Sequence, residues 1–211
     1  MNETELSTGL ALAAPPIVLA SASSTRKAML AAAGVAVQAV PARLDEETVI
    51  AALAAEGTRP RDIADALAEA KARRVEARHP GAVVIGADQV LDLDGAVLDK
   101  AADIDAVRSQ LQRLRGRTHL LHTAVVIFHD GDPVWRQVEG ARLTMRTASD
   151  AYLDAYLARH GAGLVGTAGG YRIEEEGARL FSRIEGDHFG ILGLPLIPVL
   201  NYLALRGWIA G

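Results

Sequence analysis

Residues 17–34 limit the fold most strongly: a short apolar segment leads through a polar loop into an alanine-rich segment that stops at Gly34. This order predicts a strand, a turn and a helix. The loop carries three hydroxyl groups and two cations, from Ser21, Ser23, Ser24, Arg26 and Lys27. Because backbone N–H groups and the positive end of the helix dipole converge at a helix N-terminus, this loop is suited to binding a phosphate. The alternative is that Ser23 or Ser24 only caps the helix.

The rest of the chain predicts strands alternating with helices, followed by antiparallel strands. Expected strands cover residues 35–40, 82–88, 119–128 and 134–145, with a hairpin over 91–98 that turns at Asp94-Gly95. Expected helices begin at Arg61, cover 104–114, follow Ser149, and close the chain over 195–205. The glycine-rich residues 164–193 are expected to form strands and loops. This order predicts an α/β fold with a mixed, partly antiparallel twisted sheet flanked by helices.

Composition and length are those of an ordinary globular domain. Of the 211 residues, 50% are apolar and only 4% aromatic, so the core must consist mainly of Ala, Val, Leu and Ile. We expect one domain over residues 17–211 and a loose N-terminal extension over residues 1–16. The absence of cysteine excludes disulfides and thiolate metal sites.

Charge and hydropathy bear on the partners of the chain. The net charge of −4 is unlike that of a nucleic-acid binder. No apolar run is long enough for a membrane span, and Glu3 and Glu5 stand where a signal peptide would carry basic residues. We therefore expect a cytoplasmic protein without nucleic-acid or membrane partners.

Asp88 ends the apolar run 82–88 and is expected at the carboxyl end of a buried strand. In open α/β sheets, ligands bind beyond the carboxyl ends of the strands. A carboxylate at this place is therefore a candidate for catalysis or metal binding.

The helix predicted from Arg61 has an apolar face formed by Ile63, Ala66, Leu67 and Ala70. Lys71 lies near the middle of this helix. Because a helical lysine ordinarily extends into water, the residues alone indicate a surface position for Lys71.

Four blocks of sequence follow one another in a distinctive order: Leu19–Arg26, Ile85–Leu91 with Lys100 downstream, Leu114–His119 and Ile184–Pro195. Together they resemble the signature blocks of the Maf family of nucleoside triphosphate pyrophosphatases, over nearly the whole chain after residue 16. The resemblance implies a Maf/inosine triphosphatase-like fold with two lobes around a cleft. It also implies a homodimeric enzyme that hydrolyses a nucleoside triphosphate to the monophosphate and pyrophosphate.

The resemblance assigns roles to residues at matching positions. Asp88 and Glu46 would be the catalytic carboxylates and would hold a divalent metal, Mg²⁺ or Mn²⁺. Whether Asp88 binds the metal or acts as a general base stays open. The substrate phosphates would be bound by Ser21, Ser23, Arg26, Lys71 and Lys100.

Thr25, Gln89 and Glu174 depart from the commoner branch of the family, which is directed at dTTP and UTP. The Asp88-Gln89 pair and Glu174 resemble the branch associated with 7-methyl-GTP, and a carboxylate at position 174 suits the N1–H and N2–H₂ edge of guanine. We therefore favour 7-methyl-GTP as the substrate. The alternatives are a house-cleaning pyrophosphatase for dTTP, UTP or other non-standard nucleotides, and a nucleotide-binding regulator of cell division without turnover.

Three other features are interpreted as structural. His119 and His122 are three residues apart in a predicted strand, so they face opposite sides of the sheet and form a poor metal site. Gly161–Gly166 matches a dinucleotide-binding pattern, but it follows a predicted helix instead of a strand and is interpreted as a loop. Trp135 is expected to pack in its strand rather than to stack on a base.

Overall fold

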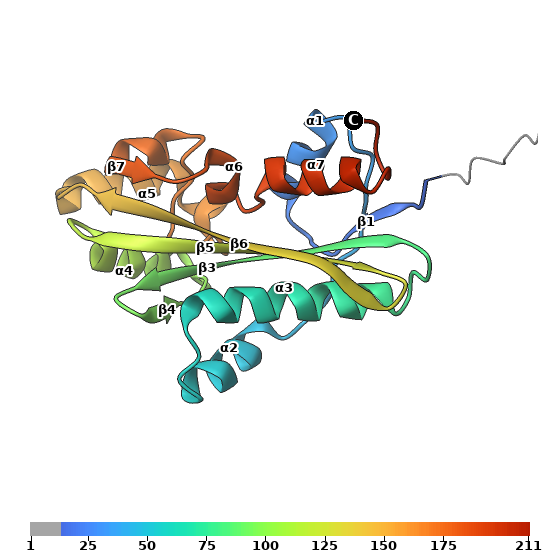
Figure 1. The fold of residues 1–211 in the computed structure, drawn as a ribbon. Coiled ribbons are helices and arrows are strands. Elements are labelled where there is room, and N and C mark those ends of the chain that lie inside the picture. Colours follow the sequence, from blue (N-terminus) through green and yellow to red (C-terminus); the bar gives the residue numbers. More distant parts are fainter. Residues whose placement is uncertain (1–13) are drawn as a thin grey trace, which may run out of the picture.

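The computed structural model describes residues 14–211, so most of the predicted extension lies outside the described residues. A seven-stranded sheet forms its centre, with the strand order β2-β1-β3-β5-β6-β7 and with β4 paired to β3 (Figure 1). The strands are β1 (Ile17–Leu19), β2 (Gln38–Ala39), β3 (Val83–Leu93), β4 (Ala96–Leu98), β5 (Thr118–His129), β6 (Asp132–Met145) and β7 (Phe181–Glu185). β1 is parallel to β2 and β3, and all other pairs are antiparallel. The predicted mixed α/β sheet is confirmed.

Seven α-helices and one 3₁₀ helix flank this sheet in the described part of the chain: α1 (Ser24–Ala32), α2 (Glu46–Ala55), α3 (Pro60–Glu76), α4 (Ile104–Leu114), α5 (Asp150–Leu164), η1 (Glu176–Leu180), α6 (His188–Ile191) and α7 (Leu196–Leu205). Side chains of β3 and β5 point alternately to the two faces of the sheet, so the hydrophobic core has a part on each face. One face packs on α3. The other face carries two clusters, one with α1 and α7 and one with α4 and α5. These two clusters form the cores of the two lobes, and the cleft lies between them.

Helix α3 approaches β3 closely because the strand has a glycine at the crossing point. A Cβ atom at Gly86 would lie 2.2 Å from the Ala68 carbonyl oxygen and 2.7 Å from the Ala72 Cβ. The buried face of α3 is rotated from the predicted one: Ala64 and Ala68 are buried while Ala66 and Ala70 are half-buried. Lys71 therefore lies on the buried face, which corrects its predicted position in water.

Several predicted boundaries were wrong. β3 continues to Leu93, so Asp88 lies within the strand and not at its carboxyl end. β2 has only two residues instead of six. Helix α2 was not predicted. Gly161 and Gly163 belong to the end of α5, so the interpretation of residues 161–166 as a loop is wrong for the first part of this motif.

No helix within residues 14–211 is long and apolar enough to cross a membrane.

The structural interpretations of the histidines and of Trp135 agree with the packing. Buried His119 bonds Tyr171, whereas His122 pairs with Asp92 on the opposite face of β5. Trp135 stacks on Tyr202 of α7, with their ring centroids 5.2 Å apart.

Candidate active site

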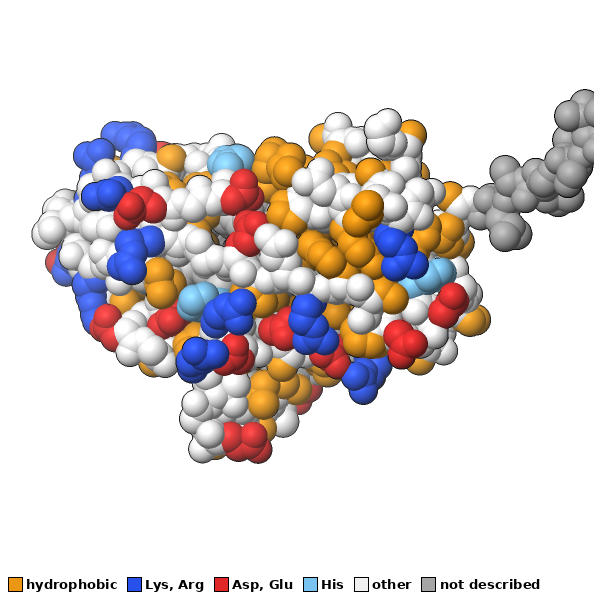
Figure 2. Space-filling model, in the orientation of Figure 1, with side chains coloured by type: hydrophobic (Ala, Val, Ile, Leu, Met, Phe, Trp, Pro, Cys, Tyr) orange, Lys and Arg blue, Asp and Glu red, His pale blue; other side chains and the backbone are white. Residues whose placement is uncertain are grey.

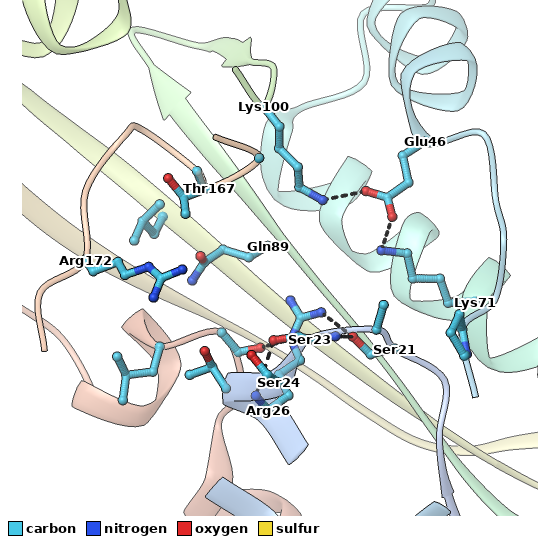
Figure 3. Close-up of a pocket in the computed structure, with 18 of the residues that line it drawn as sticks. Ser21, Ser23, Ser24, Arg26, Glu46, Lys71, Gln89, Lys100, Thr167 and Arg172 are labelled. Carbon is cyan, nitrogen blue, oxygen red and sulfur yellow. Dashed lines mark hydrogen bonds and ion pairs between the residues drawn. The ribbon is translucent and has the colours of Figure 1, made fainter. Parts of the chain in front are cut away.

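The cleft between the lobes holds a cavity of about 710 Å³ (Figure 3). Its walls come from the loop after β1, the connection between β2 and α2, the segment 165–174 and residues 191–193. Five cations and two carboxylates line it: Arg26, Arg43, Lys71, Lys100 and Arg172, against Glu46 and Glu174. In a chain with a net charge of −4, this is a local positive site that suits an anion.

The sheet exposes a free strand edge at this cavity. β1 pairs with β3 only as far as Ile85, and β4 begins to pair at Leu91. Residues 86–90 therefore have no strand partner on this edge within the described chain. The site still lies beyond the carboxyl end of a parallel strand, but that strand is β1 instead of β3.

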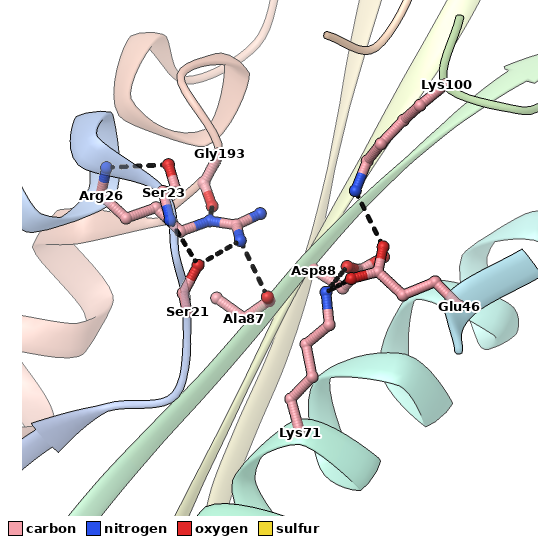
Figure 4. Close-up of polar contacts among 9 residues, drawn as sticks. All are labelled: Ser21, Ser23, Arg26, Glu46, Lys71, Ala87, Asp88, Lys100 and Gly193. Atoms are coloured by element: carbon pink, nitrogen blue, oxygen red, sulfur yellow. Dashed lines mark hydrogen bonds and ion pairs between the residues drawn. The ribbon is translucent and has the colours of Figure 1, made fainter. Parts of the chain in front are cut away.

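The Arg26 side chain hydrogen-bonds to this unpaired strand edge. Its Nε donates to the Gly193 carbonyl at 2.6 Å, and its Nη1 donates to the Ser21 hydroxyl at 3.1 Å and the Ala87 carbonyl at 3.0 Å (Figure 4). Burial lowers the pKa of Arg26, and the nearby Asp88 and Glu46 carboxylates oppose that shift. Nη2 has no acceptor within residues 14–211, so the cavity-lining guanidinium keeps two N–H donors for a ligand.

The serine loop adopts the predicted strand–turn–helix geometry. Ser23 is the N-cap of α1 and its side chain accepts from the Arg26 backbone N–H at 3.3 Å. Ser21 accepts from the Ser23 N–H at 3.2 Å. The hydroxyls thus hold the loop at the helix N-terminus, which lines the cavity together with Arg26. Ser23 therefore caps the helix, as the alternative interpretation expected, and phosphate binding by the same loop stays a prediction.

On the opposite face of β3, four charged groups form one network (Figure 4). Lys71 Nζ lies 2.5 Å from Asp88 Oδ1 and 2.6 Å from Glu46 Oε1, and Lys100 Nζ lies 2.8 Å from Glu46 Oε2. Asp88 and Lys71 are buried, at 2% and 6% exposure. Burial by itself would raise the pKa of Glu46, but Lys71 and Lys100 outweigh it and lower the pKa to about 2.

A second cavity of about 370 Å³ adjoins the first and is lined by Asp88 and Glu46. Lys100 and Gln89 line both cavities. The structure thus brings together the predicted carboxylates and the predicted lysines at the boundary between the two cavities.

The three residues predicted to select the base, Thr25, Gln89 and Glu174, all line the larger cavity. Gln89 points away from Asp88 because adjacent strand residues face opposite sides. Its Nε2 lies within hydrogen-bond distance of Thr123 Oγ1 and of the Gly190 and Ile191 carbonyls, so only its carbonyl oxygen remains for a ligand.

Sequence reasoning missed two cations of this cavity, Arg43 and Arg172. Arg172 donates to the Gly163 carbonyl at 2.9 Å and pairs with Glu175 at 3.3 Å. Each lies two or three residues before a predicted site carboxylate, Glu174 or Glu46. Their place in the same segments is the signal that could have identified them.

Asp88 and Glu46 also fit a divalent cation. No group of three or more His, Cys, Asp or Glu side chains within the described residues is arranged to hold a metal. Both carboxylates nevertheless contact the same ammonium group, so they converge on one point. Mg²⁺ is commonly held by one or two carboxylates together with substrate phosphates and water, which this pair can supply.

Known proteins are similar to this chain over most of its length. The sequence model of the family described as "Maf-like protein" matches residues 16–205. A nucleoside triphosphate pyrophosphatase of Caulobacter vibrioides is 53% identical over 91% of this chain and 96% of its own length. Proteins with the same name from Ruegeria pomeroyi and Roseobacter denitrificans are 50% and 53% identical over the same shares.

The mixed sheet, with its cation-lined cleft beyond β1, defines a nucleotide-binding α/β class of protein. The chain belongs to the Maf family.

Proposed function

We propose that this protein is a nucleoside triphosphate pyrophosphatase that hydrolyses its substrate to the monophosphate and pyrophosphate. The observation that carries the proposal is the Lys71–Asp88–Glu46–Lys100 network at the boundary of a positively charged cleft. The relatives from three organisms carry this activity in their names, and they cover nearly the whole chain.

The site residues have two roles: some would bind the phosphates, and Asp88 would activate the attacking water. Arg26, Lys71, Lys100 and the serine loop would neutralise and position the phosphates. In the reaction, an oxygen–phosphorus bond forms to water and the bridging bond between the α- and β-phosphates breaks. Asp88 would accept the proton that the water loses, and pyrophosphate would leave with the electrons of the broken bond.

A divalent cation, Mg²⁺ or Mn²⁺, would be held by Asp88 and Glu46 together with the phosphates. When bound, it would neutralise charge that develops on the phosphate oxygens. Both carboxylates contact Lys71 in this structure, so this lysine would be available either to a carboxylate or to a substrate phosphate.

We further propose that a guanine nucleotide, 7-methyl-GTP first, is the preferred substrate. Glu174 lines the larger cavity, and its carboxylate offers only acceptors, as guanine's donor edge requires. Of Gln89, only the carbonyl oxygen is available, which adds a second acceptor instead of a donor. Both observations favour a base edge that donates hydrogen bonds.

One experiment tests the activity and the two alternatives. Purified protein is incubated with Mg²⁺ or Mn²⁺ and a panel of nucleoside triphosphates that includes 7-methyl-GTP, GTP, dTTP and UTP, and pyrophosphate release is measured. Highest kcat/KM for 7-methyl-GTP is expected. Preference for dTTP or UTP would support the house-cleaning alternative. Tight triphosphate binding without pyrophosphate release would support a nucleotide-binding regulator.

A further inference from the structure

Arg43 differs from the other cations of the cleft in having no side-chain partner among residues 14–211. Arg26 has three hydrogen bonds, Lys71 and Lys100 pair with carboxylates, and Arg172 bonds Gly163 and Glu175. Arg43 lines the same cavity and is exposed, and its side chain makes no hydrogen bond or ion pair within residues 14–211. Its guanidinium keeps all five N–H donors for a ligand.

The backbone of Arg43 also adopts a conformation that long side chains rarely take. Its φ angle is +51°, in the left-handed region. The other two non-glycine residues with positive φ among those described, Asp94 and Asp130, each precede a glycine in a hairpin turn, where this conformation is ordinary. Arg43 is outside any such turn and borders the cavity, and strained residues of this kind cluster at ligand sites.

Packing of the neighbouring residues fixes this conformation. Ala42 is buried at 4% exposure in the core cluster on α3, and the half-buried Leu44 packs against the same cluster. Because both neighbours of Arg43 pack toward α3, Arg43 itself is directed away from the core. The packed neighbours thus hold Arg43 at the wall of the cavity.

We infer that Arg43 binds the pyrophosphate end of the substrate, which deepens the proposed function and rests on it. Arg43 is three residues from Glu46, a span of at most about 11 Å along the chain. Glu46 bridges Lys71 and Lys100, whereas Thr167 and Arg172 lie on the other side of the cavity (Figure 3). A forked guanidinium at this end matches the paired oxygens of a terminal phosphate.

The test is Arg43→Asn, because asparagine accepts the left-handed conformation but lacks the charge. Two quantities are measured: KM for the triphosphate that the wild-type protein hydrolyses fastest, and the Kd of inorganic pyrophosphate by calorimetry. We expect both to rise about tenfold or more, with the Kd of the nucleoside monophosphate unchanged within about twofold, since one charge-assisted contact has this magnitude. The thermal unfolding midpoint is expected to stay the same or rise, because a strained arginine is removed.

Arg78→Asn is the matched control. Arg78 is exposed, has no side-chain partner among the described residues and lines neither cavity, so its loss changes the net charge alone. An unchanged pyrophosphate Kd in Arg43→Asn would overturn the inference, as would equal weakening of monophosphate binding or equal effects in Arg78→Asn. A lowered unfolding midpoint with weakened binding would also overturn it, by indicating a structural role. If wild-type protein releases no pyrophosphate, the proposed function fails, and pyrophosphate binding still tests Arg43.

Discussion

The ammonium nitrogen of Lys71 lies 2.5 Å from the carboxylate of Asp88, although both side chains are almost completely buried. Burying two charges is unfavourable unless they are paired, so removing either side chain would leave the other buried without its partner. Glu46 completes the arrangement, because it contacts the same lysine from the N-terminus of α2.

We predict that Asp88→Asn lowers kcat by about a hundredfold or more, the scale of losing a general base. Loss of one partner of a buried pair should also lower the unfolding midpoint, so circular dichroism must show that the variant is folded. Asp92→Asn is the control, since Asp92 is a buried carboxylate in the same strand that bonds Gly95 and His122 outside the cavities. Near-normal kcat in folded Asp88→Asn would exclude the assigned role.

Glu46 should make the free energy of unfolding depend on pH in a defined acidic range. Its pKa falls from the ordinary 4.5 to about 2 in the folded protein. The folded state is therefore favoured by this group above about pH 4.5, and the contribution disappears as the pH falls from 4.5 through 2. Urea unfolding of wild type and Glu46→Gln should show a difference in unfolding free energy that is constant above pH 5 and shrinks below it. A difference that does not change with pH would contradict this.

His119 should make folding stability depend on pH in a second range. Burial lowers its pKa from 6.5 to about 4, and its Nε2 bonds the Tyr171 hydroxyl at 2.7 Å. Between pH 6.5 and 4 only the unfolded state takes up this proton, so stability falls as the pH falls through that range. His119→Gln should be less stable at neutral pH but should lose less further stability between pH 6.5 and 4. Equal slopes for both proteins would show that His119 does not titrate in this way.

Gly86→Ala should separate α3 from β3, because its Cβ would lie 2.2 Å from the Ala68 carbonyl oxygen. Overpacking of this kind costs about 1–3 kcal/mol of unfolding free energy. It should also lower kcat, since Lys71 and Asp88 are brought together by this helix–strand contact. In the control Gly140→Ala, the new Cβ has only one neighbour within 4 Å, at 3.9 Å. Similar losses in both variants would argue against the close approach at Gly86.

Glu174→Gln should change which base is preferred. The substitution introduces a hydrogen-bond donor, so the ratio of kcat/KM for UTP and dTTP to kcat/KM for guanine nucleotides should rise about tenfold or more. This is the effect of pairing one polar group or of leaving it without a hydrogen-bond partner. The readout is pyrophosphate release over the nucleotide panel. Glu56→Gln is the control, because Glu56 is an exposed carboxylate that lines neither cavity and has no side-chain partner among the described residues. An unchanged ratio in Glu174→Gln would exclude selection by this side chain.

Much of the fold could be predicted from local pattern. The hairpin at Asp94-Gly95 and the helix after Ser149 follow from turn and capping chemistry acting over a few residues. The length of β3 could not be predicted from local pattern, which indicated a strand over 82–88 and a separate hairpin over 91–98. That the two form one strand to Leu93 depends on pairing with β5 over nine successive positions from Val84 to Asp92.

The sequence by itself determined which residue types are present at the site and which family motifs they match. Tertiary structure alone decided where Lys71 points, because its burial depends on the contact of α3 with Gly86 rather than on the helix's own residues. It likewise decided that Arg26 joins Ser21, Ala87 and Gly193, of which Gly193 is 167 residues away in the chain. Periodicity and capping act between near neighbours, whereas the ionisation and direction of a buried charge are set by partners that only folding brings together.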